Sequence, residues 1–176
     1  MSASLPSRLP RIGSRGGRRV AAGGGVGQTG AMVPCASCRI IEGSAPAVWV
    51  EREEHAVAFA PLPGSALAPG HTLVLPVEHV DDLRRASPVA LAATTALVQR
   101  VIRAMHGALG ATGTVVLQAS GAGVPGDQGD PAVSVPHLHF HVIPRWPDDG
   151  AVLWPVLPSA HRVDGDPHAA LAAMFE

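Results

Sequence analysis

The chain contains no lysine and no tyrosine, and among its 176 residues there are only three tryptophans, three phenylalanines and two cysteines. It also has no apolar run long enough to cross a bilayer, so we expect no membrane-spanning segment. The missing lysine and tyrosine, beside abundant Ala, Gly, Pro, Val and Arg, indicate the coding bias of a GC-rich genome rather than a function. Two cysteines cannot complete a four-ligand zinc site, so any such site needs other donors.

Positive charge is concentrated at the N-terminus. The only charged residues of positions 1–31 are five arginines: Arg8, Arg11, Arg15, Arg18 and Arg19. The rest of the chain therefore holds 8 of the 13 basic residues and all 14 acidic ones, a net charge of −6 with histidine neutral. This acidic part offers no basic patch for nucleic acid.

Length and composition fit one domain behind a short extension. A chain of 176 residues with 47% hydrophobic residues can bury a single core. Residues 1–31 are rich in Gly, Ser and Arg without hydrophobic periodicity, so we expect them to be disordered. Met32 follows directly, and our hypothesis is that translation begins at Met32, so that the preceding segment is either not translated or a dispensable tail. We therefore expect an extension over 1–31 and one domain over 32–176.

Hydrophobic patterns over the domain predict an α+β fold with an antiparallel sheet of about five strands. The strands are expected at 47–52, 55–60, 71–75, 114–118 and 137–143. Shorter helices are expected at 81–85 and from Asp166 to near Phe175. The stretch 119–135 is rich in Gly and Pro, so we expect a loop that can cover a site beside it.

One long helix lies between the third and fourth predicted strands. Ser87 is its expected N-cap and Pro88 its first residue, while Gly110 and Gly113 end it. Its apolar residues are expected to face the sheet: Leu91, Leu97, Val98, Val101, Ile102, Met105 and Leu109.

Histidine recurs at every second position in the run His137-Leu138-His139-Phe140-His141-Val142-Ile143. On an extended strand, this spacing puts three imidazoles on one face and apolar side chains on the other. The run could be a solvent-exposed polar face, but that does not explain why no Thr, Lys or Glu occurs within it. It could instead hold a catalytic zinc, or supply a nucleophile, a proton carrier and a hydrogen-bond donor. The run alone leaves these last two interpretations open.

The flanking sequence favours the nucleophile. Upstream lies Pro69-Gly70-His71-Thr72-Leu73-Val74-Leu75-Pro76-Val77-Glu78-His79, and Pro144-Arg145 follows the histidines. With these flanks the chain closely resembles the histidine-triad superfamily of nucleotide hydrolases and transferases, from about residue 35 to 145. The resemblance is carried by specific motifs, and it implies the roles described next.

By this resemblance, His139 attacks the α-phosphorus of a nucleotide and is transiently nucleotidylated. Its Nδ1 proton is expected to be held by a backbone carbonyl, which leaves Nε2 free to react. His141 should contact phosphate oxygens, Ser134 should assist the leaving group, and His71 should support the triad by hydrogen bonding. Ser120 stands where the family has Asn, and would reach the phosphate with a shorter side chain.

The pair Cys35-x-x-Cys38 permits three interpretations: a redox pair, two buried thiols in a reducing cytosol, or half of a zinc site. The resemblance implies the third, in which His79 and His137 complete a Cys2His2 site. Four protein ligands would make this zinc structural rather than catalytic.

Besides Ser120, two segments depart from the family pattern. The chain reads Ala58-Phe59-Ala60-Pro61-Leu62-Pro63-Gly64-Ser65, without the Asp that grips the ribose hydroxyls in the family, and no carboxylate follows before His71. The family's Gly-Gln before the Ser134 position is Ala132-Val133, within an enlarged loop. These changes put nucleoside selectivity in question, although none of them removes the nucleophile.

We therefore expect a cytoplasmic nucleotide hydrolase or transferase that cleaves a nucleoside phosphoramidate or a dinucleoside polyphosphate at an α-phosphate. A structural zinc and a homodimer are expected, and neither nucleic acid nor membrane is an expected partner. Two alternatives are a catalytically weak nucleotide-binding or scaffold protein, and a metal-dependent hydrolase with the three histidines on zinc.

Overall fold

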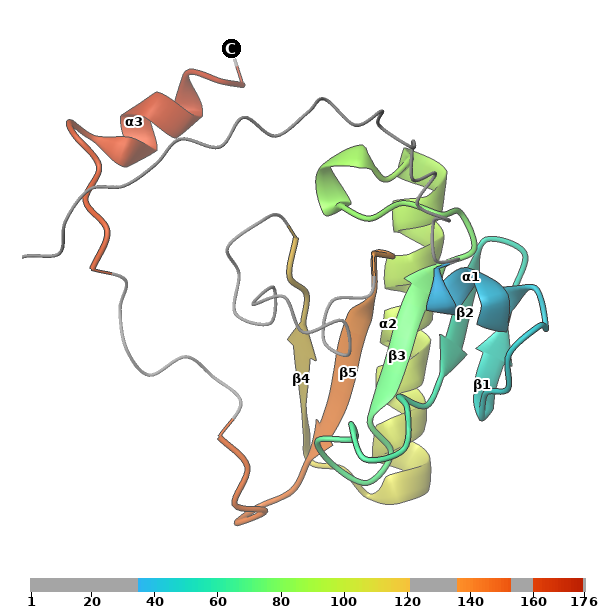
Figure 1. Cartoon of the computed structure of the whole chain (residues 1–176). Helices are drawn as coiled ribbons and strands as arrows, with labels where there is room; N and C mark the ends of the chain where they lie inside the picture. Colours follow the sequence, from blue (N-terminus) through green and yellow to red (C-terminus); the bar gives the residue numbers. More distant parts are fainter. Residues whose placement is uncertain (1–34, 121–135, 153–159, 176) are drawn as a thin grey trace, which may run out of the picture. The chain divides into compact units, whose positions relative to one another are not determined.

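The computed structural model describes residues 35–120, 136–152 and 160–175 (Figure 1). In chain order the elements are α1 (Ala36–Ile41), β1 (Trp49–Arg52), β2 (Ala56–Phe59), β3 (Thr72–Pro76), the 3-10 helix η1 (Leu83–Arg85), α2 (Pro88–Leu109), β4 (Gly113–Leu117), β5 (Phe140–Arg145) and α3 (Pro167–Ala172). None of the helices in these ranges is long and apolar enough to cross a membrane.

The strands form one antiparallel sheet in the order β1-β2-β3-β5-β4, so the α+β prediction with five strands is confirmed (Figure 1). Directly opposed residues of neighbouring strands share a face. The register pairs Phe59 with Leu73, Leu73 with His141, and His141 with Leu117. This row places His141 between two leucines on one face of the sheet.

Helix α2 covers the other face and contacts β2, β3 and β5 (Figure 1). Ser87 is its N-cap, as predicted, because its hydroxyl accepts a hydrogen bond from the Ala90 amide at 3.2 Å. Gly110 ends the helix with φ of 63°, in the left-handed region that glycine adopts freely. The buried residues of the helix are Ala90, Thr94, Leu97, Val98, Val101 and Met105.

Two residues expected on the buried side of α2 are placed differently. Leu109, in the last turn, is 45% exposed, and Leu91 is only partly buried. Thr94 takes a fully buried position instead, and its hydroxyl donates to the Ala90 carbonyl at 2.7 Å. A threonine can be buried there because the preceding turn satisfies its hydroxyl.

A second, smaller core lies on the face of the sheet opposite α2. Ile40 of α1 packs with Val57, Phe59 and Leu75, and the rings of Trp49 and Phe59 meet edge to face. This core places α1 on the β1–β2 side. The neighbouring part of the same face, over β5, carries His141.

The fifth strand begins later than predicted. It runs from Phe140 to Arg145, not from 137 to 143, because the chain before it bonds to a different segment. The Leu138 amide donates to the Val80 carbonyl at 2.5 Å, and Nε2 of His137 lies 2.9 Å from the Pro76 carbonyl oxygen. The other strands lie within two residues of their predicted bounds, while residues 1–31 and most of the expected loop 119–135 fall outside the described ranges.

Candidate active site and metal centre

The histidines divide into two groups. His137 and His79 face two cysteines, whereas His139, His141 and His71 lie together beside β5. The ring centroids of His79 and His137 are 5.2 Å apart, those of His139 and His141 4.9 Å, and those of His71 and His141 5.1 Å. The alternating run therefore serves two centres, and its three rings do not converge on one point.

The first group is the metal cluster, which we define as Cys35, Cys38, His79 and His137. One ligand atom from each residue lies within 4.8 Å of all the others. Nδ1 of His137 is 3.6 Å from both sulfurs, and Nδ1 of His79 is 3.1 Å from Sγ of Cys38. In the part of the chain that the structure describes, no other group of His, Cys, Asp and Glu has this arrangement.

The two distances of 3.6 Å at His137 fit a tetrahedral metal, and the 3.1 Å between His79 and Cys38 is somewhat shorter. Zinc bonds of about 2.3 Å to sulfur and about 2.05 Å to nitrogen place neighbouring S and N atoms about 3.6 Å apart. The Nε2–H of His137 donates to the Pro76 carbonyl, so Nδ1 keeps its lone pair for a metal. The donor set and its geometry therefore fit zinc, with all four positions supplied by protein.

Helix α1, which the sequence analysis did not predict, brings Cys35 and Cys38 close together. Cys35 is the N-cap residue of this helix, and Cys38 lies three residues later. In a helix, residues at this spacing lie on the same side. The six-residue segment Ala36–Ile41 is too short to show a hydrophobic period. Its buried Ile40 packs against β2 and β3, and this contact cannot be seen from the segment's own sequence.

In the second group, His139 is the residue with a defined reactive nitrogen. Its Nδ1 lies 2.7 Å from the backbone carbonyl oxygen of His137, a distance at which Nδ1–H must be the donor. The neutral ring then carries its lone pair on Nε2. This is the tautomer expected from the sequence, assigned here from the acceptor that faces Nδ1.

His71 and His141 form a chain of hydrogen bonds beside it. The Leu67 amide donates to Nδ1 of His71 at 3.1 Å, so the proton of His71 is on Nε2. Nε2 of His71 lies 3.0 Å from Nδ1 of His141 and donates to it, which leaves the proton of His141 on its own Nε2. His71 thus fixes the ring of His141, and His141 offers an N–H donor.

Burial keeps both rings of this pair neutral. Desolvation lowers the pKa of His141 to about 4, with His139 and His71 adding to the effect. The pKa of His71 is also lowered, first by burial and then by the charge that His139 can carry. The pair therefore supplies directed dipoles at neutral pH and no fixed positive charge.

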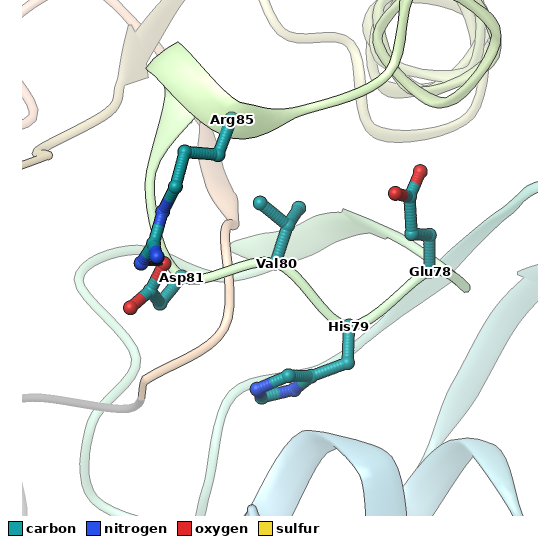
Figure 2. A pocket seen from close by; sticks show the side chains of 5 residues that line it. All are labelled: Glu78, His79, Val80, Asp81 and Arg85. Atoms are coloured by element: carbon teal, nitrogen blue, oxygen red, sulfur yellow. Dashed lines mark hydrogen bonds and ion pairs between the residues drawn. The ribbon is translucent and has the colours of Figure 1, made fainter.

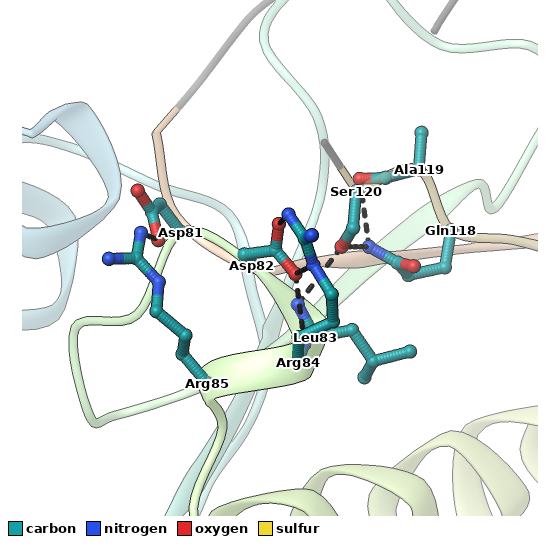
Figure 3. Close-up of polar contacts among 8 residues, drawn as sticks. All are labelled: Asp81, Asp82, Leu83, Arg84, Arg85, Gln118, Ala119 and Ser120. Atoms are coloured by element: carbon teal, nitrogen blue, oxygen red, sulfur yellow. Dashed lines mark hydrogen bonds and ion pairs between the residues drawn. The ribbon is translucent and has the colours of Figure 1, made fainter. Parts of the chain in front are cut away.

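Of the two predicted phosphate-site serines, Ser120 bonds to other parts of the chain and Ser134 lies outside the described ranges. The Ser120 hydroxyl accepts from the Leu83 amide at 3.0 Å and from Nε2 of Gln118 at 2.8 Å (Figure 3). Figure 3 shows this pair next to Asp82, which binds Arg84, an arrangement that the sequence analysis missed.

A cavity of about 310 Å³ opens next to the metal cluster and is lined by Glu78, His79, Val80, Asp81 and Arg85 (Figure 2). Asp81 and Arg85 form an ion pair, and the ring of His79 points away from Glu78. None of the histidines beside β5 lines this cavity. It therefore belongs to the surroundings of the metal cluster.

Comparisons with known proteins identify the family of the chain. The HIT domain model matches residues 42–148. An uncharacterized HIT-like protein of Mycobacterium tuberculosis is 34% identical over 112 residues, which cover 64% of this chain and 72% of that protein. One from Methanocaldococcus jannaschii is 32% identical over 119 residues, covering 68% and 84%.

Among solved structures, a zinc-bound histidine triad family protein from Mycobacterium smegmatis is similar with a TM-score of 0.57 and 29% identity, covering 81% of this chain and 96% of that one. The chain belongs to the HIT family.

Proposed function

We propose that this protein is a nucleotide hydrolase or transferase that cleaves at an α-phosphate through a nucleotidyl intermediate on His139. The observation that carries the proposal is the 2.7 Å contact between Nδ1 of His139 and the His137 carbonyl, which leaves a neutral nitrogen nucleophile at Nε2. The substrates proposed are nucleoside phosphoramidates and dinucleoside polyphosphates. Family membership supports the general class, and the choice of substrate is part of the proposal.

The proposed reaction has two steps. Nε2 of His139 forms a bond to the α-phosphorus as the P–N or P–O bond to the leaving group breaks, and the leaving group takes up a proton. Water then attacks the same phosphorus as the Nε2–P bond breaks, and it releases a proton to solvent in place of the one that the leaving group took up; this frees AMP or its counterpart and restores neutral His139. His141 donates its Nε2–H to a phosphate oxygen, His71 holds His141, and Ser134 and Ser120 complete the phosphate contacts.

We propose zinc as the structural ion of the metal cluster. The fit of Cys35, Cys38, His79 and His137 to a tetrahedral ion supports this assignment. When bound, zinc would supply cross-links among α1, the turn after β3 and the segment before β5. The alternative hydrolase with three histidines on one zinc is less favoured, because His137 faces the cysteines and His139 does not.

One observation favours a binding protein with little turnover as the second candidate. Between Phe59 and His71 the chain carries no charged side chain, so no carboxylate in this segment can grip ribose hydroxyls. Tight binding of a nucleotide without hydrolysis would support this candidate.

A homodimer is proposed to form through β4. Of the two edge strands, β1 carries Glu51 and Arg52 and an irregular register, features that block strand pairing. β4 carries no charge over Gly113–Leu117, and its Val116 is 38% exposed. Val116→Lys should convert the dimer to monomer in light scattering, and Val50→Lys on β1 is the control that should not.

The deciding experiment mixes purified protein with adenosine 5′-phosphoramidate or a diadenosine polyphosphate and follows AMP release. Intact mass spectrometry without acid then looks for an AMP adduct. We expect turnover and an adduct in the wild type, and neither in His139→Ala. His106→Ala, an exposed histidine in the last turn of α2, is the matched control and should behave as wild type. No turnover and no adduct in folded protein would overturn the proposal.

A further inference from the structure

The peptide group between His137 and Leu138 lies between the two histidine centres and bonds at both ends. Its carbonyl oxygen accepts from Nδ1 of His139 at 2.7 Å, and its N–H donates to the Val80 carbonyl at 2.5 Å. A peptide group is rigid and planar, so fixing one end fixes the direction of the other. The orientation of the His139 ring therefore depends on where the Val80 backbone lies.

Both residues at this junction adjoin ligands of the metal cluster. Val80 follows His79, and His137 supplies the carbonyl with its main chain and a ligand nitrogen with its side chain. A third tie runs from Nε2 of His137 to the Pro76 carbonyl at 2.9 Å. His137 is 1% exposed and Leu138 2%, so water cannot easily replace these bonds.

We infer that the metal cluster positions the nucleophile: a metal ion held by Cys35, Cys38, His79 and His137 fixes the His137–Leu138 peptide group and through it the reactive tautomer of His139. His137 is then a positioning residue as well as a ligand. Without the ion, the segments at 79–80 and 137–138 are joined by the Leu138–Val80 hydrogen bond and by side-chain packing, with no bond to a shared ion, and can shift. A shifted carbonyl no longer holds Nδ1–H of His139, and the proton can move to Nε2, where it blocks attack.

The inference rests on the proposed function, in which His139 is the nucleophile, but its main test does not require that the protein turn over a substrate. Full-length protein labelled with 15N-histidine is studied by NMR in the zinc-loaded form, after chelation and after reloading. The His139 signals are assigned from their loss in His139→Ala. We expect one tautomer with the proton on Nδ1 in the loaded protein, a mixture after chelation, and recovery with zinc. The Leu138 amide should also exchange its hydrogen faster after chelation.

If the stripped protein unfolds, Cys35→Ser serves instead, since it keeps three of the four ligands. Val101→Ala, a core truncation in α2 away from the cluster, is the control for lost stability alone and should keep the single tautomer. In kinetic measurements with a substrate that the wild type hydrolyses, Cys35→Ser should lower kcat by about 10-fold or more with little change in KM. An unchanged His139 tautomer in folded, metal-free protein would overturn the inference, as would purified protein that binds no zinc. Absence of turnover with the expected tautomer change would instead count against the proposed function.

Discussion

The metal cluster and the group of His71, His139 and His141 beside β5 differ in how their nitrogen and sulfur atoms are used. In the cluster, four ligand atoms face one another within 4.8 Å, and the second nitrogen of His137 is bound to Pro76. Beside β5, Nδ1 of His139 bonds to the His137 carbonyl and Nδ1 of His141 bonds to His71. Within the described residues, Nε2 of each of these two rings has no hydrogen bond. The first arrangement is closed and the second is open.

The difference shows how one short sequence serves two purposes. His137 and His139 are separated by a single residue, yet one ring is 1% exposed and turned to sulfur while the other keeps its Nε2 lone pair. The two rings differ because His137 lies in the segment that bonds to Val80 and Pro76, whereas His139 directly precedes the start of β5 at Phe140. A closed set of ligands should decide stability, and an open set should decide reactivity, which the following substitutions test.

The largest expected effect is on activity, at the open site. His139→Ala should lower turnover by about 10³-fold or more, because it removes the proposed nucleophile. The free energy of unfolding should fall by only about 1 kcal/mol, the contribution of one hydrogen bond. AMP release and chemical denaturation measure the two quantities. A variant that keeps substantial turnover would show that the open site has another nucleophile.

The next largest effect is on stability, at the closed site. His79 is exposed, so His79→Ala leaves no cavity in the core, and any large destabilisation must come from the lost ligand. Because zinc contributes about 10–16 kcal/mol to folding in zinc-finger peptides, we expect the free energy of unfolding to fall by several kcal/mol. His55→Ala, another exposed histidine, is the matched control.

A chelator sharpens this test. With zinc removed, wild type and His79→Ala should melt at nearly the same temperature, since the ligand no longer has an ion to bind. A difference that survives chelation would mean that His79 stabilises the fold in some other way.

A smaller effect is expected from pH. The pKa of His141 is lowered to about 4 and that of His71 is lowered too, so the unfolded chain binds these protons more readily than the folded protein does. Their neutral forms therefore stabilise the fold fully above pH 6.5, and the contribution is lost as pH falls from 6.5 towards 4. His141→Gln should lose less stability over this range than wild type. Both proteins are measured with zinc bound, so the pH dependence that the metal cluster adds is the same in each and cancels in the difference. Parallel curves of unfolding free energy against pH would show that His141 is not held neutral.

The smallest effect is expected at Ser120. Ser120→Ala removes the acceptor for the Leu83 amide and for Gln118, which should cost about 1 kcal/mol of unfolding free energy. If these two bonds are its whole role, KM should change little. A large rise in KM with the same kcat would instead support the proposed phosphate contact.

The sequence predicted the fold well where the pattern is local. Ser87 and Pro88 start α2, Gly110 ends it, and alternation located the strands to within two residues except at the fifth. The ligand set came from the resemblance and is assembled in one place. Signals that depend on distant segments were missed: α1 needs its packing partners on β2 and β3, and the start of β5 depends on the bond from Leu138 to Val80.

The spacing of the metal ligands along the chain also sets an order of events in folding. Cys35 and His137 are 102 residues apart, so their meeting closes a long loop, whereas α2 forms from contacts between residues four apart. We expect the helix and the strands to associate first and the four ligands to meet late. A newly made chain that is short of zinc would then hold its core and its long helix before it held His139 in place.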